Sequence, residues 1–240
     1  MSYCQEFYCD EAEINTQNLY LRLCTEFPNP FSCFMKIYDK YIISSSMERF
    51  MKKEVKKIIS QPIKGTFKSY DDNKENEAAM HSLQNNQKER AENVMIVDLV
   101  RNDLARISNP GTIKVEELCG IYTFKGVNQM ISTVTSEIKN NAHFTEIIQD
   151  AFPMGSMTGA PKRMAMQLIE QYESTKRGAY SGALGYINPD GDFDLNVLIR
   201  SFVFNSTLHY LSVHSGAAIT YDSIPEKEYD ECLLKINKLL

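Results

Sequence analysis

Two pairs of glutamates have types and spacing that could do chemistry. Glu89 and Glu92 lie three positions apart, and Glu228 and Glu231 repeat that spacing. Residues three apart on a helix share a face, so each pair would present two carboxylates together. Carboxylate oxygens with no histidine one turn away favour a hard cation such as Mg²⁺, which is often completed by water and substrate. The alternative for either pair is a solvated helix face.

Lys64 offers a different chemistry within the run P-I-K-G-T at residues 62–66. A lysine whose neighbours lower its pKa can act as a covalent nucleophile. The alternative is a surface lysine in a turn. Glu48 lies between the apolar residues Met47 and Phe50, and this position is compatible with partial burial. The local sequence by itself favours a carboxylate in solvent at the start of a helix.

The stretch P-M-G-S-M-T-G-A-P-K at residues 153–162 could bind an anion. Gly155 and Gly159 permit tight backbone geometry, and Pro161 suits the first turn of a following helix. The unpaired N–H groups of that turn would favour a carboxylate or a phosphate. The stretch is not a Walker motif, because its second glycine is not followed by Lys-Ser or Lys-Thr. A glycine-rich turn with no ligand remains the open alternative.

Helical and strand patterns must position these residues. Strand patterns occupy residues 1–7, 31–37, 41–44, 113–115, 127–134, 181–187, 193–204 and 208–213. Helical patterns occupy residues 18–24, 77–107 and 143–152, a segment after residue 162, and residues 225–240. Residues 44–50 and 67–77 are predicted to be loops. Arg200 interrupts the apolar run 193–204, which makes it a candidate inward-facing cation that needs an anionic partner.

Two of the helical patterns predict a buried stripe. Each is defined by apolar residues at helical spacing. In the helix after residue 162 the predicted stripe is Met164, Leu168, Ile169 and Tyr172. In the last helix it is Tyr229, Leu233, Ile236 and Leu240, with Glu228, Glu231 and Lys235 beside it.

The composition excludes several classes of protein. The 240 residues carry a net charge of −5, which argues against general binding to nucleic acid or to a membrane surface. The sequence has no apolar run of membrane-spanning length and no visible signal peptide. Its six cysteines form no C-x-x-C pair, so we expect reduced, mostly core cysteines in a cytoplasmic protein.

Five segments, in this order along nearly the whole chain, resemble the chorismate-utilising enzymes. They are P-I-K-G-T, E-R-A-E-N-V-M-I-V-D-L-V-R-N-D-L, G-S-M-T-G-A-P-K, the block 180–200 and E-Y-D-E-C-L-L-K. The resemblance implies one chorismate-binding catalytic domain over residues 1–240, with the family's N-terminal half absent. It also implies an α+β fold, an α/β sandwich of antiparallel sheets flanked by helices.

Within the family, the lysine at position 64 is similar to the aminodeoxychorismate synthases, whereas the anthranilate synthases resemble P-I-A-G-T. The resemblance implies that Lys64 attacks C2 of chorismate and displaces the 4-hydroxyl group, to which Glu48 donates a proton. Ammonia from a separate glutamine amidotransferase subunit (component II) then displaces the lysine, entering at C4. The product is 4-amino-4-deoxychorismate, on the route to para-aminobenzoate and folate. An enzyme like anthranilate synthase component I and a non-catalytic chorismate-binding module are the alternatives.

The same resemblance implies the roles of further residues. Glu92 and Glu231 would bind Mg²⁺ directly, and Glu89 and Glu228 would bind it through water. Chorismate would be held by Gly65, Thr66, Thr158, Gly159, Tyr180, Arg200, Gly216 and Lys235. The sequence departs from the family at Gln129, where many relatives have a histidine, and at Met47, which replaces a proline.

Overall fold

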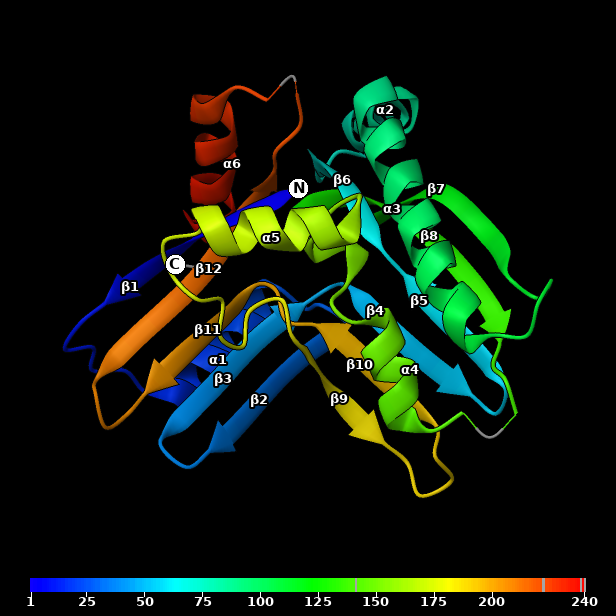
Figure 1. Cartoon of the computed structure of the whole chain (residues 1–240). Helices are drawn as coiled ribbons and strands as arrows, with labels where there is room; N and C mark the ends of the chain where they lie inside the picture. The colour runs from blue at the N-terminus through cyan, green and yellow to red at the C-terminus, as the bar shows by residue number, and fades with distance from the viewer. Residues whose placement is uncertain (141, 222, 238, 240) are drawn as a thin grey trace. The chain divides into compact units, whose positions relative to one another are not determined.

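The computed structural model describes residues 1–140, 142–221, 223–237 and 239 (Figure 1). The chain divides into two compact units, each built on its own β-sheet. The first unit comprises residues 1–47, 157–184 and 197–240, and the second comprises residues 48–156 and 185–196. The predicted α+β class with antiparallel sheets and helices is confirmed. The prediction of one domain over residues 1–240 stays a prediction.

The first unit is built on a five-stranded sheet in the order β1-β12-β11-β3-β2 (Figure 1). All of its neighbouring strands run antiparallel. Its strands are β1 (Ser2–Cys9), β2 (Phe31–Ile37), β3 (Lys40–Ser46), β11 (Ser201–Asn205) and β12 (Tyr210–Ala218). Its helices are α1 (Thr16–Glu26), α5 (Lys162–Tyr172) and α6 (Pro225–Asn237).

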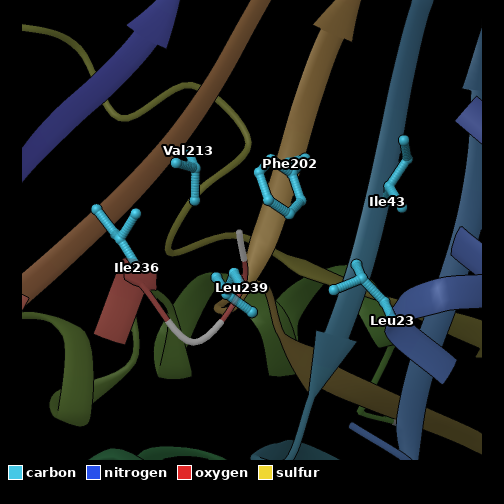
Figure 2. Packing of buried hydrophobic residues seen from close by; sticks show 6 residues of the cluster. All are labelled: Leu23, Ile43, Phe202, Val213, Ile236 and Leu239. Atoms are coloured by element: carbon cyan, nitrogen blue, oxygen red, sulfur yellow. The ribbon is translucent and has the colours of Figure 1, made fainter. Parts of the chain in front are cut away.

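The core of the first unit covers one face of this sheet (Figure 2). Phe202 lies directly opposite Ile43 on one side and Val213 on the other, so these three side chains share a face. Leu23 of α1 and Ile236 of α6 pack against them, and all five side chains are buried. Burial of these apolar side chains therefore joins both helices to the sheet.

The second unit is built on a seven-stranded sheet in the order β6-β8-β5-β4-β10-β9, with β7 pairing on β8. Its helices α2 and α3 pack on this sheet beside β6, β7 and β8. The strands are β4 (Arg49–Glu54), β5 (Lys57–Gln61), β6 (Ile63–Lys68), β7 (Lys114–Phe124), β8 (Val127–Glu137), β9 (Ala183–Ile187) and β10 (Phe193–Val197). The helices are α2 (Asn73–Asn85), α3 (Gln87–Ile107), α4 (Phe144–Ala151) and the short 3₁₀ helix η1 (Gly155–Met157).

The helix predicted over residues 77–107 is in fact two helices, which meet at Asn86. This residue has extended backbone angles, and its side chain accepts a hydrogen bond of 3.1 Å from the N–H of Glu89. An asparagine in this position caps the start of a helix, so α3 begins anew there. The loop predicted over residues 67–77 is also shorter than expected, because α2 already begins at Asn73 behind its cap Asp72.

The strand predicted over residues 193–204 is interrupted, and Arg200 lies in the interruption. β10 ends at Val197 in one sheet, and β11 begins at Ser201 in the other. Arg200 has a φ of +51°, a left-handed conformation that ends an extended strand. The sequence therefore located an unusual arginine correctly but placed it on a continuous strand.

The two predicted helix stripes are partly wrong. In α5, Met164 and Tyr172 are exposed by 53% and 56%, and Ala165 is the buried residue. Pro161 is the N-cap and not the first helical residue. In α6 the buried positions are Glu228, Cys232 and Ile236, whereas Tyr229 is exposed. Spacing located the helices, but the neighbouring sheet decided which residues face inward. The predicted stripe member Leu240 lies outside the described residues.

All six cysteines are free, as predicted, but only half of them belong to the core. Cys4, Cys119 and Cys232 are buried, whereas Cys9 is exposed and the other two are half-buried. Among the helices in the described part of the chain, none has the length and apolar character needed to cross a bilayer.

Phe202→Ala is expected to lower the free energy of unfolding by about 3–5 kcal/mol, because it leaves a cavity where two strands and two helices meet. The measurement is urea denaturation followed by circular dichroism. Leu21→Ala is the matched control on the exposed side of α1, where the side chain is 61% exposed, and it should change the value by less than about 0.5 kcal/mol. Equal losses in the two variants would contradict the assignment of the core.

Candidate active site

The predicted site residues fall into two sets, one in each unit. We call the set in the second unit the lysine cluster: Glu48, Lys64, Gly65, Thr66, Glu89 and Glu92. We call the set in the first unit the arginine cluster: Thr158, Gly159, Tyr180, Arg200, Gly216, Glu228, Glu231 and Lys235. Each cluster has its own geometry within its unit.

Lys64 lies at a β-bulge on β6. The register of β6 against β8 shifts between Ile63 and Thr66, so Lys64 and Gly65 together face the single residue Met130. A bulge bends its strand and changes the direction of a side chain. Lys64 thus lies on a strand that is distorted at this residue, and the alternative of a surface lysine in a turn is wrong.

Gly65 allows the bulge to lie close to α3. Its φ is +104°, and an added Cβ would stand 3.1 Å from the Cβ of Met130 and 3.4 Å from the Cβ of Glu89. The backbone angle and the close approach both require glycine. A packing role for Gly65 is therefore visible, while its predicted contact with a substrate stays a prediction.

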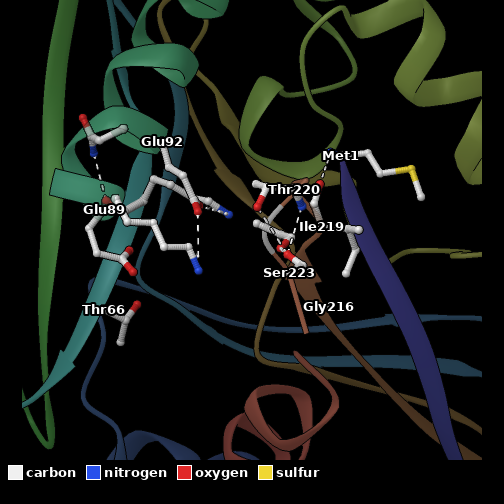
Figure 3. Close-up of polar contacts among 12 residues, drawn as sticks. Met1, Thr66, Glu89, Glu92, Gly216, Ile219, Thr220 and Ser223 are labelled. Carbon is white, nitrogen blue, oxygen red and sulfur yellow. Dashed lines mark hydrogen bonds and ion pairs between the residues drawn. The ribbon is translucent and has the colours of Figure 1, made fainter. Parts of the chain in front are cut away.

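The two glutamates of α3 lie beside β6 (Figure 3). Glu92 is only 8% exposed, and its Oε2 lies 3.6 Å from Nζ of Lys64. Its other oxygen, Oε1, lies 3.9 Å from Nζ of Lys88, an exposed side chain. Glu89 is half-buried in the first turn of the helix. Glu92 therefore points toward the lysine, as expected for a carboxylate on the inner face of the helix.

Glu48 is buried, contrary to the solvent-exposed carboxylate that the local sequence favoured. It is 4% exposed, because residues 44–50 form the end of β3 and the start of β4 and not a polar loop. The hydroxyl of Ser156 donates a hydrogen bond of 2.5 Å to Oε1 of Glu48. The partner Ser156 lies 108 residues further along the chain, so the residues next to Glu48 in the sequence could not reveal its burial.

Burial controls the protonation of Glu48. It raises the pKa of this carboxyl to about 7, against the opposing effects of the Ser156 hydroxyl, the N–H of Ile63 and the charge of Lys64. A buried acid with a pKa near neutrality can exist in both protonation states. Glu48 can therefore donate a proton at neutral pH, as a general acid must.

Thr66 and Gln129 form a polar pair on β6 and β8. The hydroxyl of Thr66 donates a hydrogen bond of 2.8 Å to Oε1 of Gln129, which is buried. Gln129 takes the position where the resemblance has a histidine, so the neighbour of Thr66 is a neutral amide.

In the arginine cluster, Arg200 and Lys235 are linked through the end of α6. Nη1 of Arg200 donates a hydrogen bond of 2.8 Å to the main-chain carbonyl of Lys235. Nζ of Lys235 donates to the carbonyl of Gly216 at 2.8 Å and to Oε1 of Glu231 at 2.5 Å. Burial lowers the pKa of Arg200, whereas nearby Tyr180 and Glu231 favour its charged form. Both cationic side chains thus have fixed main-chain contacts.

Tyr180 is held by stacking. Its ring lies 5.4 Å from the ring of His214 with an interplanar angle of 18°, and the side chain is 8% exposed. Burial raises the pKa of the Tyr180 phenol, so the group stays a neutral hydrogen-bonding hydroxyl. At Gly216 an added Cβ would stand 2.8 Å from the carbonyl oxygen of Tyr3, so this glycine permits the pairing of β1 with β12.

The glycine-rich stretch contacts the start of β1. The carbonyl of Thr158 accepts a hydrogen bond of 2.6 Å from the N–H of Ser2. Gly159 has a φ of +138°, and an added Cβ would stand 2.8 Å from Cα of Met1. Met1 in turn pairs with Ile219 through its main chain (Figure 3). A close backbone approach thus accounts for Gly159, and anion binding by this stretch stays a prediction.

Sequence reasoning missed Arg177, which holds this stretch in place. Its guanidinium donates to the carbonyl of Met157 at 2.7 Å, to Oγ of Ser181 at 2.9 Å and to the carbonyl of Ser2 at 3.0 Å. It also forms a two-pronged ion pair with the buried carboxylate of Glu173. Two of its partners, Met157 and Ser2, are 20 and 175 residues away in the chain, so the sequence around Arg177 did not reveal this role.

Sequence reasoning also missed Ser156 and Asn93. Ser156 is the hydroxyl that contacts Glu48, and Asn93 is 1% exposed and donates to the main chain of Lys64. The signal that the sequence offered for Asn93 was an asparagine near the apolar residues of a predicted helix. Both residues lie inside motifs that carry the family resemblance.

The magnesium site stays a prediction. Glu228 is 9% exposed, and Glu231 pairs with Lys235. Among the residues that the structure describes, no group of three or more His, Cys, Asp or Glu side chains could hold a metal ion. Each unit nevertheless supplies two glutamates on one helix, and carboxylate oxygens are the donors that Mg²⁺ prefers.

Comparison with known proteins identifies the family. The family described as chorismate binding enzyme matches residues 1–240, and the chain therefore belongs to that family. The chain is 40% identical over 211 residues to aminodeoxychorismate synthase component 1 of Salmonella typhimurium, covering 88% of this chain and 46% of that protein. It is 38% identical over 212 residues to anthranilate synthase component 1 of Saccharolobus solfataricus, covering 88% and 50%. The chain spans about half the length of these curated relatives.

Solved structures agree with this assignment. The crystal structure of anthranilate synthase component I from Streptococcus pneumoniae matches with a TM-score of 0.90 and 31% identity, covering 99% of this chain and 52% of that one. The menaquinone-specific isochorismate synthase of Escherichia coli matches with a TM-score of 0.86 at 20% identity, which supports the fold alone. The predicted resemblance to the chorismate-utilising enzymes and the predicted fold are confirmed.

Compared with the native chain, the Glu48→Gln variant is expected to gain stability as the pH rises. Between pH 4.5, the ordinary pKa, and about 7 the unfolded chain releases a proton that folded Glu48 retains. The native chain therefore loses about 3 kcal/mol of stability over this range, and the amide does not. Urea denaturation at several pH values, from about 4 to about 8, measures the difference between variant and native chain.

The exposed residue Glu137 provides the control for this measurement. Glu137→Gln is measured over the same pH range, and its difference from the native chain shows the effect of removing an exposed carboxyl group. A pH-dependent difference for Glu48→Gln no larger than that for Glu137→Gln would contradict the effect of burial on Glu48.

Proposed function

We propose that this chain is the chorismate-binding catalytic part of an aminodeoxychorismate synthase. The reaction converts chorismate and ammonia into 4-amino-4-deoxychorismate and water. The observation that carries the proposal is the lysine cluster, in which Lys64 lies at a bulge beside the buried acid Glu48. A nucleophilic amine next to a proton donor is the arrangement that a covalent displacement requires.

In the first step, the neutral amine of Lys64 forms a bond to C2 of chorismate. The ring electrons shift and the bond from C4 to its hydroxyl group breaks. Glu48, in its protonated form, donates a proton to the departing oxygen, which leaves as water. The near-neutral pKa of Glu48 makes this form available at physiological pH.

In the second step, ammonia forms a bond to C4, and the bond between C2 and the lysine breaks. The ammonium of Lys64 gives a proton to solvent before the first step, and the released amine takes one up again and restores the ion pair with Glu92. The anionic carboxylate of Glu48 can then accept the proton that ammonia loses. The ammonia would come from a glutamine amidotransferase subunit, as implied by the resemblance.

We assign substrate binding to the arginine cluster. Arg200 and Lys235 are cations with fixed main-chain partners, so they are oriented before any ligand arrives. A guanidinium and an ammonium suit the carboxylates of chorismate. Thr158, Gly159, Tyr180 and Gly216 would contribute hydrogen bonds and shape.

We also propose Mg²⁺ as the cofactor. Glu92 and Glu231 would hold the ion directly, and Glu89 and Glu228 would hold it through water. When bound, Mg²⁺ would supply positive charge to a carboxylate of the substrate. Carboxylates that are mostly buried, such as Glu92 and Glu228, are expected to have such a partner.

Anthranilate synthase is the second candidate, because relatives of that name match at similar identity. The two reactions differ in whether a lysine acts as nucleophile. The lysine at position 64 and its contact with Glu92 favour the aminodeoxychorismate reaction.

Lys64→Ala is expected to abolish turnover by at least about 10³-fold, because it removes the nucleophile. The assay supplies chorismate, Mg²⁺ and excess ammonium, and the product is identified by mass spectrometry. Lys68→Ala is the matched control on the same strand, and it should retain activity because Lys68 is exposed and its ammonium lies over the ring of Tyr70. Anthranilate with pyruvate would instead support the second candidate. Binding of chorismate by a folded chain with no product would support a non-catalytic module.

Glu92→Gln is expected to weaken Mg²⁺ binding at least about tenfold, because an amide oxygen carries no charge. Isothermal titration of Mg²⁺ into the chain without chorismate measures this independently of turnover. Glu137→Gln is the control in the same unit and should bind as the native chain does. Identical isotherms for the two variants would remove Glu92 from the set of proposed ligands.

A further inference from the structure

Asn93 is a buried residue of α3 whose side chain bridges the bulge that carries Lys64. Its Nδ2 donates one hydrogen bond of 3.0 Å to the carbonyl of Lys64 and one of 3.2 Å to the carbonyl of Met130. These two carbonyls belong to neighbouring strands, β6 and β8, at the position where their register shifts. One amide group therefore contacts both sides of the bulge.

The bulge needs such a partner. Because Lys64 and Gly65 together oppose Met130, the regular ladder of main-chain hydrogen bonds is interrupted there. Buried carbonyls left without a donor would cost free energy. The amide of Asn93 supplies the missing donors, so the distorted conformation of β6 is stable.

The orientation of the Asn93 amide is itself determined by its acceptor oxygen. Oδ1 accepts a hydrogen bond of 2.5 Å from Oγ of Ser132, and the thiol of Cys119 lies 3.7 Å away as a second donor. Ser132 also accepts a hydrogen bond of 2.9 Å from the N–H of Cys119. The two donors and the acceptor of the amide are thus all used, and rotation of the group would break every contact.

We propose that Asn93 is the positioning residue that holds the Lys64 amine in its reactive place, by fixing the bulge of β6 against β8. This inference rests on the proposed function, in which Lys64 is the nucleophile. Asn93 contacts the lysine only through the main chain and does not touch the substrate. Glu92, which is next to Asn93 in the sequence, forms an ion pair with the amine of Lys64. One turn of α3 therefore contacts both the side chain and the main chain of Lys64.

The central test compares Asn93→Ala with Asn128→Ala. Asn128 is an equally buried asparagine on β8 that donates to the carbonyl of Lys68 on the same strand β6, at 3.3 Å, and to Oδ1 of Asn76 at 2.9 Å. Both variants remove a buried amide between β8 and β6, but only Asn93 is at the bulge. Loss of Asn93 should lower kcat about 10–100-fold, with KM for chorismate within about twofold of the native value. Loss of Asn128 should lower Tm and leave kcat within about twofold.

A second measurement does not depend on turnover. An acetylating N-hydroxysuccinimide ester labels exposed amines, and peptide mass spectrometry gives the labelling rate of Lys64 relative to Lys227, an exposed lysine on α6, in each chain. Asn93→Ala should change this ratio at least about threefold, whereas Asn128→Ala should leave it unchanged. A role confined to stability would move Tm but not the ratio.

Ser132→Ala keeps both donors of Asn93 and removes the hydrogen bond that orients them. It is expected to lower kcat about 3–10-fold, and it stands in for Asn93→Ala if that variant does not fold. The proposal is overturned if folded Asn93→Ala, or folded Ser132→Ala in its place, retains native kcat and native labelling. It is also overturned if Asn93→Ala and Asn128→Ala lose kcat equally.

The failure of the proposed function would look different. In that case Lys64→Ala would keep its activity, while the labelling ratio would still report whether Asn93 positions the lysine.

Discussion

The distorted pairing of β6 with β8 is the constraint on which the lysine cluster depends. A regular ladder would give Lys64 a partner of its own and the direction of an ordinary strand residue. Instead, Gly65 adopts a conformation that favours glycine, and α3 approaches the strand closely enough to supply hydrogen bonds from Asn93. The same approach brings Glu92 to the amine. A single local irregularity thus decides where the amine of Lys64 lies relative to its neighbours on the helix.

The burial of Glu48 is the second structural feature that affects the proposed chemistry. Placing a carboxyl group where water is excluded is unfavourable for its charged form, so its pKa rises toward neutrality. Ser156 limits the cost by donating a short hydrogen bond. The protein therefore accepts reduced stability at high pH at the residue that we propose as the acid. In the arginine cluster, by contrast, Arg200 and Lys235 obtain fixed hydrogen-bond partners from the main chain.

The comparisons and the structure answer different questions. Membership of the chorismate binding enzyme family and the likeness to a solved anthranilate synthase component I define the class and the fold. They do not separate the members of the family, since relatives with two different names match at similar identity. The choice between the reactions rests on the chemistry of Lys64 and its neighbours. That is why the decisive assay identifies the product.

The sequence alone determined many of the helices and strands, the class of fold, the family and the residues that could do chemistry, although it did not indicate β4, β5 and β6. These follow from local patterns: period and turn residues for the strands and helices, and ordered motifs for the family. Only the tertiary structure decided that Glu48 is buried, that Arg200 lies between two strands of different sheets, and that Asn93 donates a hydrogen bond to Lys64. The physical reason is distance along the chain. Asn93 and Lys64 are 29 residues apart and Ser156 and Glu48 are 108 apart, so no local pattern contains their hydrogen bonds, and burial depends on which segments pack together.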